Sequence, residues 1–278
     1  MPAERIAQNL AFINWTVLTA LAVGAFSAVV LARVRTDATR GFLAFTTACA
    51  VILGLLALGS DGALPTVLTD SPIAADPAWA IPRRLALLVF CVLAATYLVA
   101  LLGNRRAVPI GVGGLVAGVA VLTFGALGWG GGLLGAVPLL VQLAVLAAAT
   151  GGVFAAMILG HWYLVTPRLP EAPLVLFGRL LTAVLTLQVV LFVVWAAVGA
   201  GPGGEGRFGI LVGPWALFVW LRLIVGLIFP LVVSWAAVKT ASTRSMESAT
   251  GLLYINVGTI AAGTILAAGL YFGAGLLV

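Results

Sequence analysis

The sequence predicts an all-α, polytopic integral membrane protein, and three observations lead to that fold class. Of the 278 residues, 63% are hydrophobic and 8% are charged, whereas soluble domains carry about 25% charged residues. Eight apolar runs are each long enough to cross a bilayer, which takes about 20 residues. The basic residues concentrate in alternate connections between these runs, as the positive-inside rule expects.

The predicted spans follow one another in a single transmembrane domain over residues 1–278. They cover approximately Leu10–Leu31, Gly41–Gly59, Leu85–Gly103, Pro109–Gly128, Ala136–Val165, Leu174–Gly199, Phe208–Val238 and Thr250–Leu277. A seven-span arrangement, in which two adjacent runs merge, is the alternative. We expect no cleavable signal peptide, because the apolar run after Met1–Gln8 is long enough to remain in the membrane as a spanning helix.

Glycine and proline interrupt the sequence where the runs end, because neither continues a helix cheaply. Pro82 precedes the third run, Pro109 opens the fourth, and Gly-rich segments follow the fourth and sixth. Within the seventh run, Pro214 and Pro230 predict a kink that frees backbone carbonyls.

The charges orient the eight spans. One side receives eight basic and three acidic residues: Arg33, Arg35, Arg40, Arg105, Arg106, Arg168, Lys239 and Arg244 with Asp37, Glu171 and Glu247. The other side receives four basic and five acidic residues: Arg5, Arg83, Arg84 and Arg207 with Glu4, Asp61, Asp70, Asp76 and Glu205. The basic side should be cytoplasmic, so both termini are expected on the non-cytoplasmic side of a bacterial-type inner (plasma) membrane. This topology accounts for the net charge of +6, and we expect no nucleic-acid partner.

Two pairs of glycines at GxxxG spacing mark places where helices can approach closely. Gly114 and Gly118 form one pair, and Gly269 and Gly273 form the other. Packing within the chain is the favoured interpretation, and a subunit interface is the alternative. The sequence shows no clear internal repeat.

Motifs for catalysis are missing. The sequence has no Walker loop, no HExxH and no GxSxG, and each of these would carry a specific chemistry. Cys49 and Cys91 fall inside apolar runs and resemble small buried hydrophobes rather than a disulfide or a metal pair. We therefore favour a protein without catalytic activity of its own.

His161 is the single histidine and lies near the basic end of the fifth predicted span. An imidazole there could be an axial ligand of haem or chlorophyll, or donate a hydrogen bond to a quinone carbonyl. A structural or interfacial role, beside Trp162 and Tyr163, is the alternative. Arg179 lies at a similar depth in the sixth span, so the two are expected to converge on one polar or anionic group unless Arg179 snorkels to the interface.

Arg222 lies near the middle of the seventh predicted span, where snorkelling is costly. No carboxylate is expected within any span, so the guanidinium must find carbonyls, an amide such as Gln142, Gln188 or Asn256, water or a ligand. Tyr254 and Asn256 of the eighth span are expected to face the interior and extend a polar pocket. The candidate ligand-binding residues are therefore His161, Arg179, Arg222, Tyr163, Tyr254 and Asn256.

Two functions from different classes fit these features. The favoured hypothesis is a non-catalytic subunit of a larger, electron-transfer-related membrane complex that helps form a quinone, haem or lipid site. Its partners would be membrane lipids and other membrane subunits or further copies of the chain. The alternative is a small permease or channel for an anion or neutral solute that uses Arg222. A lipid-modifying enzyme with His161 as base is the weakest, because no carboxylate is placed to orient the imidazole.

Overall fold

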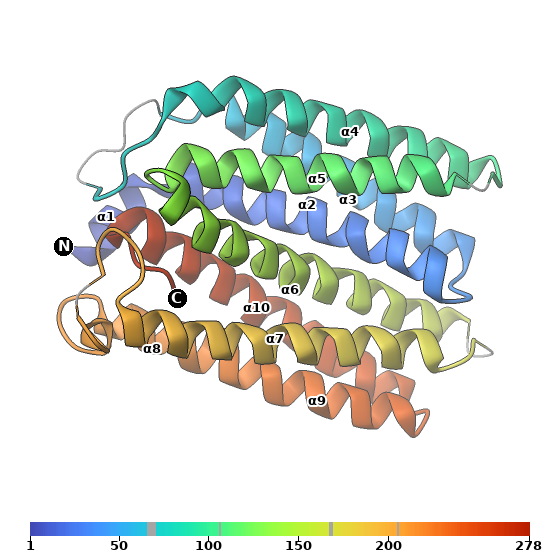
Figure 1. Ribbon diagram of the computed structural model, residues 1–278. Coiled ribbons are helices and arrows are strands. Elements are labelled where there is room, and N and C mark those ends of the chain that lie inside the picture. Colours follow the sequence, from blue (N-terminus) through green and yellow to red (C-terminus); the bar gives the residue numbers. More distant parts are fainter. Residues whose placement is uncertain (66–70, 106, 167–168, 205) are drawn as a thin grey trace.

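The computed structural model describes residues 1–65, 71–105, 107–166, 169–204 and 206–278, which form an elongated helical bundle (Figure 1). Within these ranges, eight helices are long and apolar enough to cross a membrane, which confirms the predicted fold class and eight spans rather than seven. The spans are α2 (Leu10–Arg35), α3 (Arg40–Asp61), α4 (Ala80–Leu102), α5 (Val108–Trp129), α6 (Leu133–Val165), α7 (Ala172–Val198), a composite of α8 (Ala216–Leu223), η3 (Ile224–Ile228) and α9 (Phe229–Ser242), and α10 (Met246–Ala274). The short elements are α1 (Pro2–Gln8), η1 (Pro77–Trp79) and η2 (Gly209–Leu211).

Both chain ends lie toward the same end of the bundle, on the left in Figure 1. We name this the terminal end; the connecting residues 62–65, 71–79, 130–132, 199–204 and 206–215 are located there. The opposite end, which we name the basic end, holds the connecting residues 36–39, 103–105, 107, 166, 169–171 and 243–245. Of the charges assigned to the two sides, Asp70, Arg106, Arg168 and Glu205 lie outside the described residues.

The outer surface of the bundle is apolar along its length. Large aliphatic side chains are more than half exposed on several spans, among them Val99, Val116, Val190 and Val232. A soluble protein would not expose so continuous an apolar surface. Hydrocarbon, with which these side chains mix without cost, is therefore the medium that suits this surface.

The packing divides the spans into two groups of four. Helices α2, α3, α4 and α5 contact one another in chain order, and α6, α7, the α8–α9 composite and α10 do the same. The most extensive contact of all joins α2 to α6, the first helix of each group. In each of two further contacts, the last helix of one group packs against the first helix of the other group. These contacts are α5 with α6 and α10 with α2. We name these groups the first and second halves; no internal repeat in the sequence indicated this division.

The contact between the halves depends on two glycines. A Cβ added to Gly24 on α2 would lie 1.8 Å from the Ala147 carbonyl oxygen, and one added to Gly151 on α6 would lie 2.2 Å from the Ala25 nitrogen. Such close backbone approach is a main source of helix association in lipid. The GxxxG pairs also pack within the chain, since Gly114 faces the Phe26 ring and Gly269 faces Ile6.

Several predicted helix ends differ from the structure by three or more residues, and three of them have a clear local cause. The third span begins at Ala80 rather than Leu85, because Asp76 caps the preceding η1 turn by accepting the Ala78 N–H and Pro82 fits a first helical turn. The seventh begins at Ala216 rather than Phe208, whose φ is +57°. The eighth ends at Ala274, where Gly275 adopts φ +70° and its N–H donates to the Tyr271 carbonyl at 2.7 Å, an αL-type helix end.

Gly151→Ala should destabilise the protein, because its Cβ has no room against the α2 backbone. We expect a loss of about 1–3 kcal/mol or more, as for overpacking of a core. Gly152→Ala is the matched control: its Cβ meets nothing within 4 Å, and replacing a helical glycine should be neutral or stabilise by up to about 1 kcal/mol. Tryptophan fluorescence during thermal unfolding in micelles measures both, and equal melting temperatures would contradict the assigned crossing.

Candidate functional site

Arg222 is a buried cation on α8. Its side chain is 2% exposed, and it lies six residues after α8 begins, about 9 Å along the helix axis at 1.5 Å per residue. A charge in hydrocarbon is expensive and is rarely kept without a partner or a task. The guanidinium is therefore solvated by the protein or by something the protein binds.

Two acceptors within the second half contact this guanidinium. One terminal nitrogen donates to Gln188 Oε1 on α7 at 2.7 Å, and the other donates to the Gly226 carbonyl at 3.3 Å. Gln188 in turn donates to the Val145 carbonyl of α6 at 3.0 Å. Arg222 Nε has no hydrogen-bond partner, and no carboxylate lies within ion-pair distance of Arg222 among the described residues. Within the described part of the chain, the cation is therefore held by neutral groups, and one of its three nitrogens has no acceptor.

The local sequence explains why the Gly226 carbonyl is available. In an α-helix, that carbonyl would accept the N–H of residue 230, but Pro230 has no N–H. The helix widens here into the π-helical η3, and such single turns occur frequently at functional sites. The predicted freeing of a backbone carbonyl is thus confirmed at Gly226.

Glycines also bring α10 against the Arg222 side chain. A Cβ on Gly226 would lie 2.6 Å from Gly263 Cα, and one on Gly263 would lie 2.8 Å from the Arg222 guanidinium nitrogen. Larger residues at either position would displace the guanidinium. We name Arg222, Gln188, Gly226 and Gly263 the Arg222 layer.

The first half contains a second buried arginine, which corrects the sequence prediction. Arg83 and Asp61 were assigned to a loop, but Arg83 lies within α4, Asp61 is the last residue of α3, and both are buried. Their side chains form an ion pair at 2.7 Å. The guanidinium also lies 4.6 Å from the Trp129 ring centroid and 5.5 Å from that of Trp15, within the range of cation–π attraction.

The two buried arginines therefore differ in how their charge is balanced. Arg83 has a carboxylate and two aromatic faces, so its site is electrically complete within the chain. Arg222 has an amide and a carbonyl in place of the carboxylate. This difference makes Arg222 the better candidate for binding something negative.

Further polar groups continue from Arg222 toward the basic end. Asn256 on α10 is fully buried and donates to Ser234 Oγ at 2.7 Å and to the Pro230 carbonyl at 3.1 Å. Its Oδ1 has no partner among the described residues. The hydroxyls of Thr150 and Thr264 meet at 2.7 Å between α6 and α10. The second half thus has a polar interior with one unused donor and one unused acceptor.

His161 lies on the outer surface near the basic end, not in this interior. It is exposed, and its Nδ1 is 3.4 Å from the Tyr254 hydroxyl. Tyr254 is 48% exposed, so the expectation that it faces the interior was wrong, whereas Asn256 does face inward. Tyr163 is buried and donates to the Pro170 carbonyl. Because Nδ1 contacts tyrosine, His161 Nε2 is the nitrogen that remains for a haem, chlorophyll or quinone.

Arg179 is exposed on α7, while its neighbour Gly178 packs against Val238 of α9. No hydrogen bond or ion pair joins Arg179 to His161 within the described part of the chain. The structure thus separates the six predicted residues: Arg222 and Asn256 in the interior, Tyr163 buried at the basic end, and His161, Tyr254 and Arg179 exposed.

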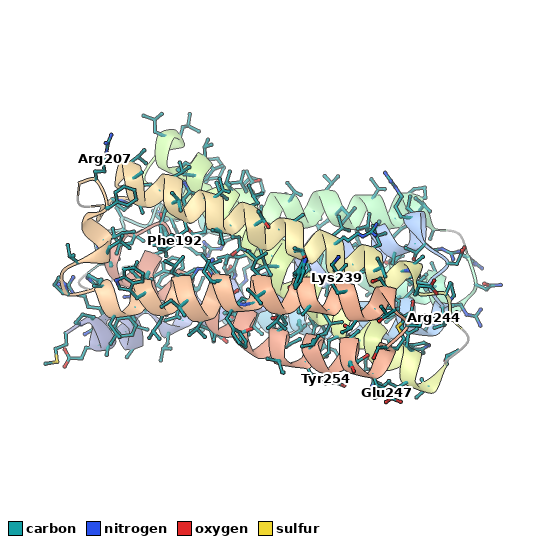
Figure 2. The ribbon with its side chains drawn as sticks, turned by 90° about the horizontal axis from the view of Figure 1, so that it is seen from below. Phe192, Arg207, Lys239, Arg244, Glu247 and Tyr254 are labelled. Atoms are coloured by element: carbon teal, nitrogen blue, oxygen red, sulfur yellow. The ribbon has the colours of Figure 1, made fainter. Side chains whose placement is uncertain are left out.

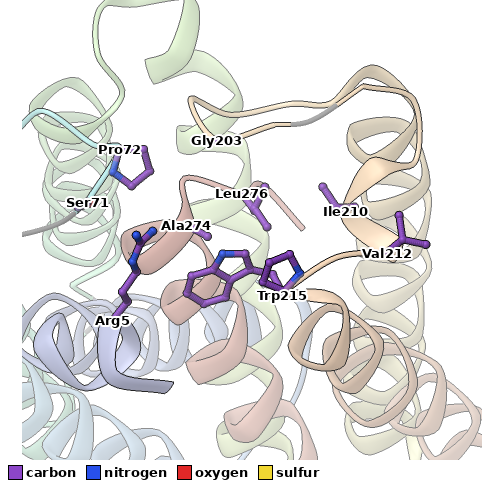
Figure 3. Close-up of a pocket in the computed structure, with 10 residues that line it drawn as sticks. Arg5, Ser71, Pro72, Gly203, Ile210, Val212, Trp215, Ala274 and Leu276 are labelled. Atoms are coloured by element: carbon purple, nitrogen blue, oxygen red, sulfur yellow. The ribbon is translucent and has the colours of Figure 1, made fainter. Parts of the chain in front are cut away.

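A cavity of about 400 Å³ opens at the terminal end. Arg5 and Pro72 lie on one side of it and Ile210 and Val212 on the other, with Trp215 and Leu276 between them (Figure 3). Arg207 also lies at this end, whereas Arg244 and Glu247 mark the basic end (Figure 2). The sequence did not indicate this cavity, because its walls come from segments far apart in the chain.

The chain matches no protein-family model, no curated protein and no solved structure. Among the described residues, no group of three or more His, Cys, Asp or Glu side chains is placed to hold a metal ion. Functional inference therefore rests on the geometry of the Arg222 layer and of the exposed polar residues.

Asp61→Asn should destabilise the first half strongly, because it leaves the buried Arg83 charge uncompensated. Breaking a buried ion pair from one side costs about 3–5 kcal/mol, and we expect a loss of that size, with a change in the fluorescence of Trp15 and Trp129. Asp76→Asn is the same substitution at an exposed site and should cost less than about 0.5 kcal/mol. Unfolding by denaturant in mixed micelles compares them; similar losses would show that the ion pair does not stabilise α3 against α4.

Proposed function

We propose that the protein is a small permease or channel for an anion or a neutral hydrogen-bonding solute, with its path through the second half. One observation carries the proposal: Arg222 is buried, and among the described residues it has no carboxylate partner and its Nε has no acceptor. A negative or electron-rich solute beside Nε would complete its coordination. A bacterial-type inner (plasma) membrane, with the basic end cytoplasmic, is the location that accompanies this proposal.

The energetics favour a visiting anion over a purely structural arginine. Keeping an unpaired guanidinium in a low-dielectric interior costs several kcal/mol, and an apolar residue would spare that cost. The same chain neutralises Arg83 with Asp61, so carboxylate pairing is available to this fold. Its absence at Arg222 leaves a positive potential, which attracts anions without trapping them in a salt bridge.

The groups beyond Arg222 suit a path for a solute. Gln188 and Asn256 can each donate and accept, and Ser234 adds a hydroxyl. These groups lie on α7, α10 and α9 and face one interior. Several weak, exchangeable sites allow a solute to enter and leave, as transport requires.

Arg222→Gln should lower anion flux sharply, because the amide keeps hydrogen-bonding capacity but removes the charge. In proteoliposomes we expect nitrate and formate flux to fall by about tenfold or more, a loss of at least about 1.4 kcal/mol, with Arg222→Lys intermediate. Arg179→Gln removes the same charge from the exposed face of α7 and should leave flux unchanged. Glycerol permeation, followed by liposome swelling, tests the neutral solute. Absence of any flux in the unmodified protein, or equal flux in Arg222→Gln, would refute a permease or channel.

A second candidate, a non-catalytic subunit of a larger electron-transfer-related membrane complex, has its own support. Arg179 is exposed on a spanning helix, and the His161–Tyr254 pair is exposed near the basic end. Polar groups on a lipid-facing surface are costly, and a neighbouring subunit, a quinone, a haem or a lipid headgroup would satisfy them. On this proposal His161 Nε2 faces the cofactor or partner, and Arg222 is structural.

If this second candidate is right, the protein purified in mild detergent will migrate with defined partner subunits or carry a visible-light chromophore. His161→Ala should abolish the chromophore or weaken the association, because the ring nitrogen is lost. Ser242→Ala, at an exposed residue whose hydroxyl bonds only its own helix, is the control and should change neither. A homogeneous, colourless protein that contains this chain alone would exclude the complex.

A further inference from the structure

The segment Gly275–Val278 folds back into the second half after α10 ends. Leu276 and Val278 are 4% and 2% exposed, although neither belongs to a helix. Backbone bonds tie the segment to the connection after α7: the Gly203 N–H donates to the Gly275 carbonyl at 3.2 Å, and the Leu277 N–H donates to the Ala200 carbonyl at 3.3 Å. The segment therefore fills space between the helices.

This segment separates the cavity at the terminal end from the Arg222 layer. Leu276 lines the cavity, and Leu276 and Val278 belong to one apolar cluster with Phe192 and Val219. Val219 precedes Arg222 by three residues, and Phe192 follows Gln188 by four, so both lie one turn from the layer. The segment therefore packs with side chains of α7 and α8 that lie one turn from Gln188 and Arg222.

Val278 also contacts the polar groups of α6. Its N–H donates to Gln142 Oε1 at 3.3 Å, and Gln142 lies one turn from Val145, whose carbonyl accepts from Gln188. The segment is thus bonded to α6 one turn from the carbonyl that accepts from Gln188, the amide that holds Arg222.

The backbone around the segment suits a hinge. Gly275 has φ +70° and Gly201 has φ +102°, conformations that glycine adopts at little cost. A Cβ on Gly203 would lie 1.8 Å from the Ala274 carbonyl oxygen, so the two connections meet through bare backbone. Rotation about these glycines would break the bonds from the segment to Ala200, Gly203 and Gln142 without breaking hydrogen bonds within the spanning helices.

We propose that the cavity lined by Arg5, Trp215 and Leu276 is the entrance for small anions that reach Arg222, and that Gly275–Val278 is the gate between them. The entrance and its gate deepen the proposed permease or channel and rest on it. Arg5 is the charged side chain among the described residues of the cavity wall, and its sign matches that of Arg222. The substrate class is a small anion able to pass where Leu276 now packs.

The test measures access to Val219, which is fully buried behind the gate. In a background with Cys49→Ala and Cys91→Ala, Val219→Cys is labelled by a membrane-impermeant thiol reagent added from the terminal side. Leu276→Gly should accelerate labelling by about tenfold or more, because it shifts the population toward the open gate. Leu134→Gly, the same truncation at an exposed residue near the start of α6 that does not line the cavity, should leave the rate unchanged. Equal rates in all three proteins would overturn the gate.

A second variant covers the case in which Leu276→Gly does not fold. Ala200→Cys with Leu277→Cys places cysteines on residues joined by a backbone hydrogen bond. The disulfide should hold the gate shut, stop nitrate flux and slow Val219→Cys labelling, and a reductant should restore both. Labelling that continues unchanged in the oxidised protein would overturn the gate.

Nitrate protection tests the substrate class separately. Excess nitrate should slow Val219→Cys labelling in the Leu276→Gly protein, and Arg222→Gln should remove that protection. Protection that persists in Arg222→Gln would overturn the link between the entrance and Arg222. If Leu276→Gly accelerates labelling but no nitrate flux occurs, the gate is supported and the permease or channel is refuted.

Discussion

The Arg222 guanidinium must be solvated in a medium that cannot solvate it, and this constraint shapes the second half of the bundle. Water would stabilise the charge at no cost, but the side chain is 2% exposed within an apolar structure. The protein substitutes Gln188 Oε1 and the Gly226 carbonyl. Each substitute requires a local feature: a glutamine on α7, a proline that frees a carbonyl, and two glycines that let α10 approach.

The contrast with Arg83 shows that these features are not a general solution for a buried arginine in this fold. In the first half, Asp61 and two indole rings balance the charge, and they do so by rigid, direct contacts. In the second half, the acceptors are neutral and one guanidinium nitrogen is unused. A balanced site stabilises a structure, whereas an unbalanced one retains the capacity to bind. The two halves therefore share an architecture and differ in electrostatics.

The sequence predicted the spans because hydrocarbon imposes a length and a composition that a single chain displays directly. It also predicted Gln188 among the possible partners of Arg222 and a freed backbone carbonyl near Pro230. It placed Arg83 and Asp61 wrongly, because a charged pair near a helix end resembles a loop until the partners are known to meet. The signal available was the proline at residue 82, which is compatible with a first helical turn.

Other features could not be predicted from the sequence, because they depend on contacts between segments that are far apart in the chain. The fold-back of Gly275–Val278 joins residues 275–278 to residues 200–203 and to Gln142. The exposure of Arg179 depends on which face of α7 packs against α9, and the division into two halves depends on the Gly24–Gly151 crossing. Apolar composition is nearly uniform in these helices, so periodicity gives little indication of which faces meet.

Anomalous diffraction from crystals grown in bromide would show whether an anion binds at Arg222, because it locates the anion without reference to transport. We predict a bromide peak within hydrogen-bonding distance of Arg222 Nε, lost in Arg222→Gln. Bromide found only beside exposed arginines such as Arg207, with the Arg222 layer unchanged and unoccupied at saturating bromide, would contradict it.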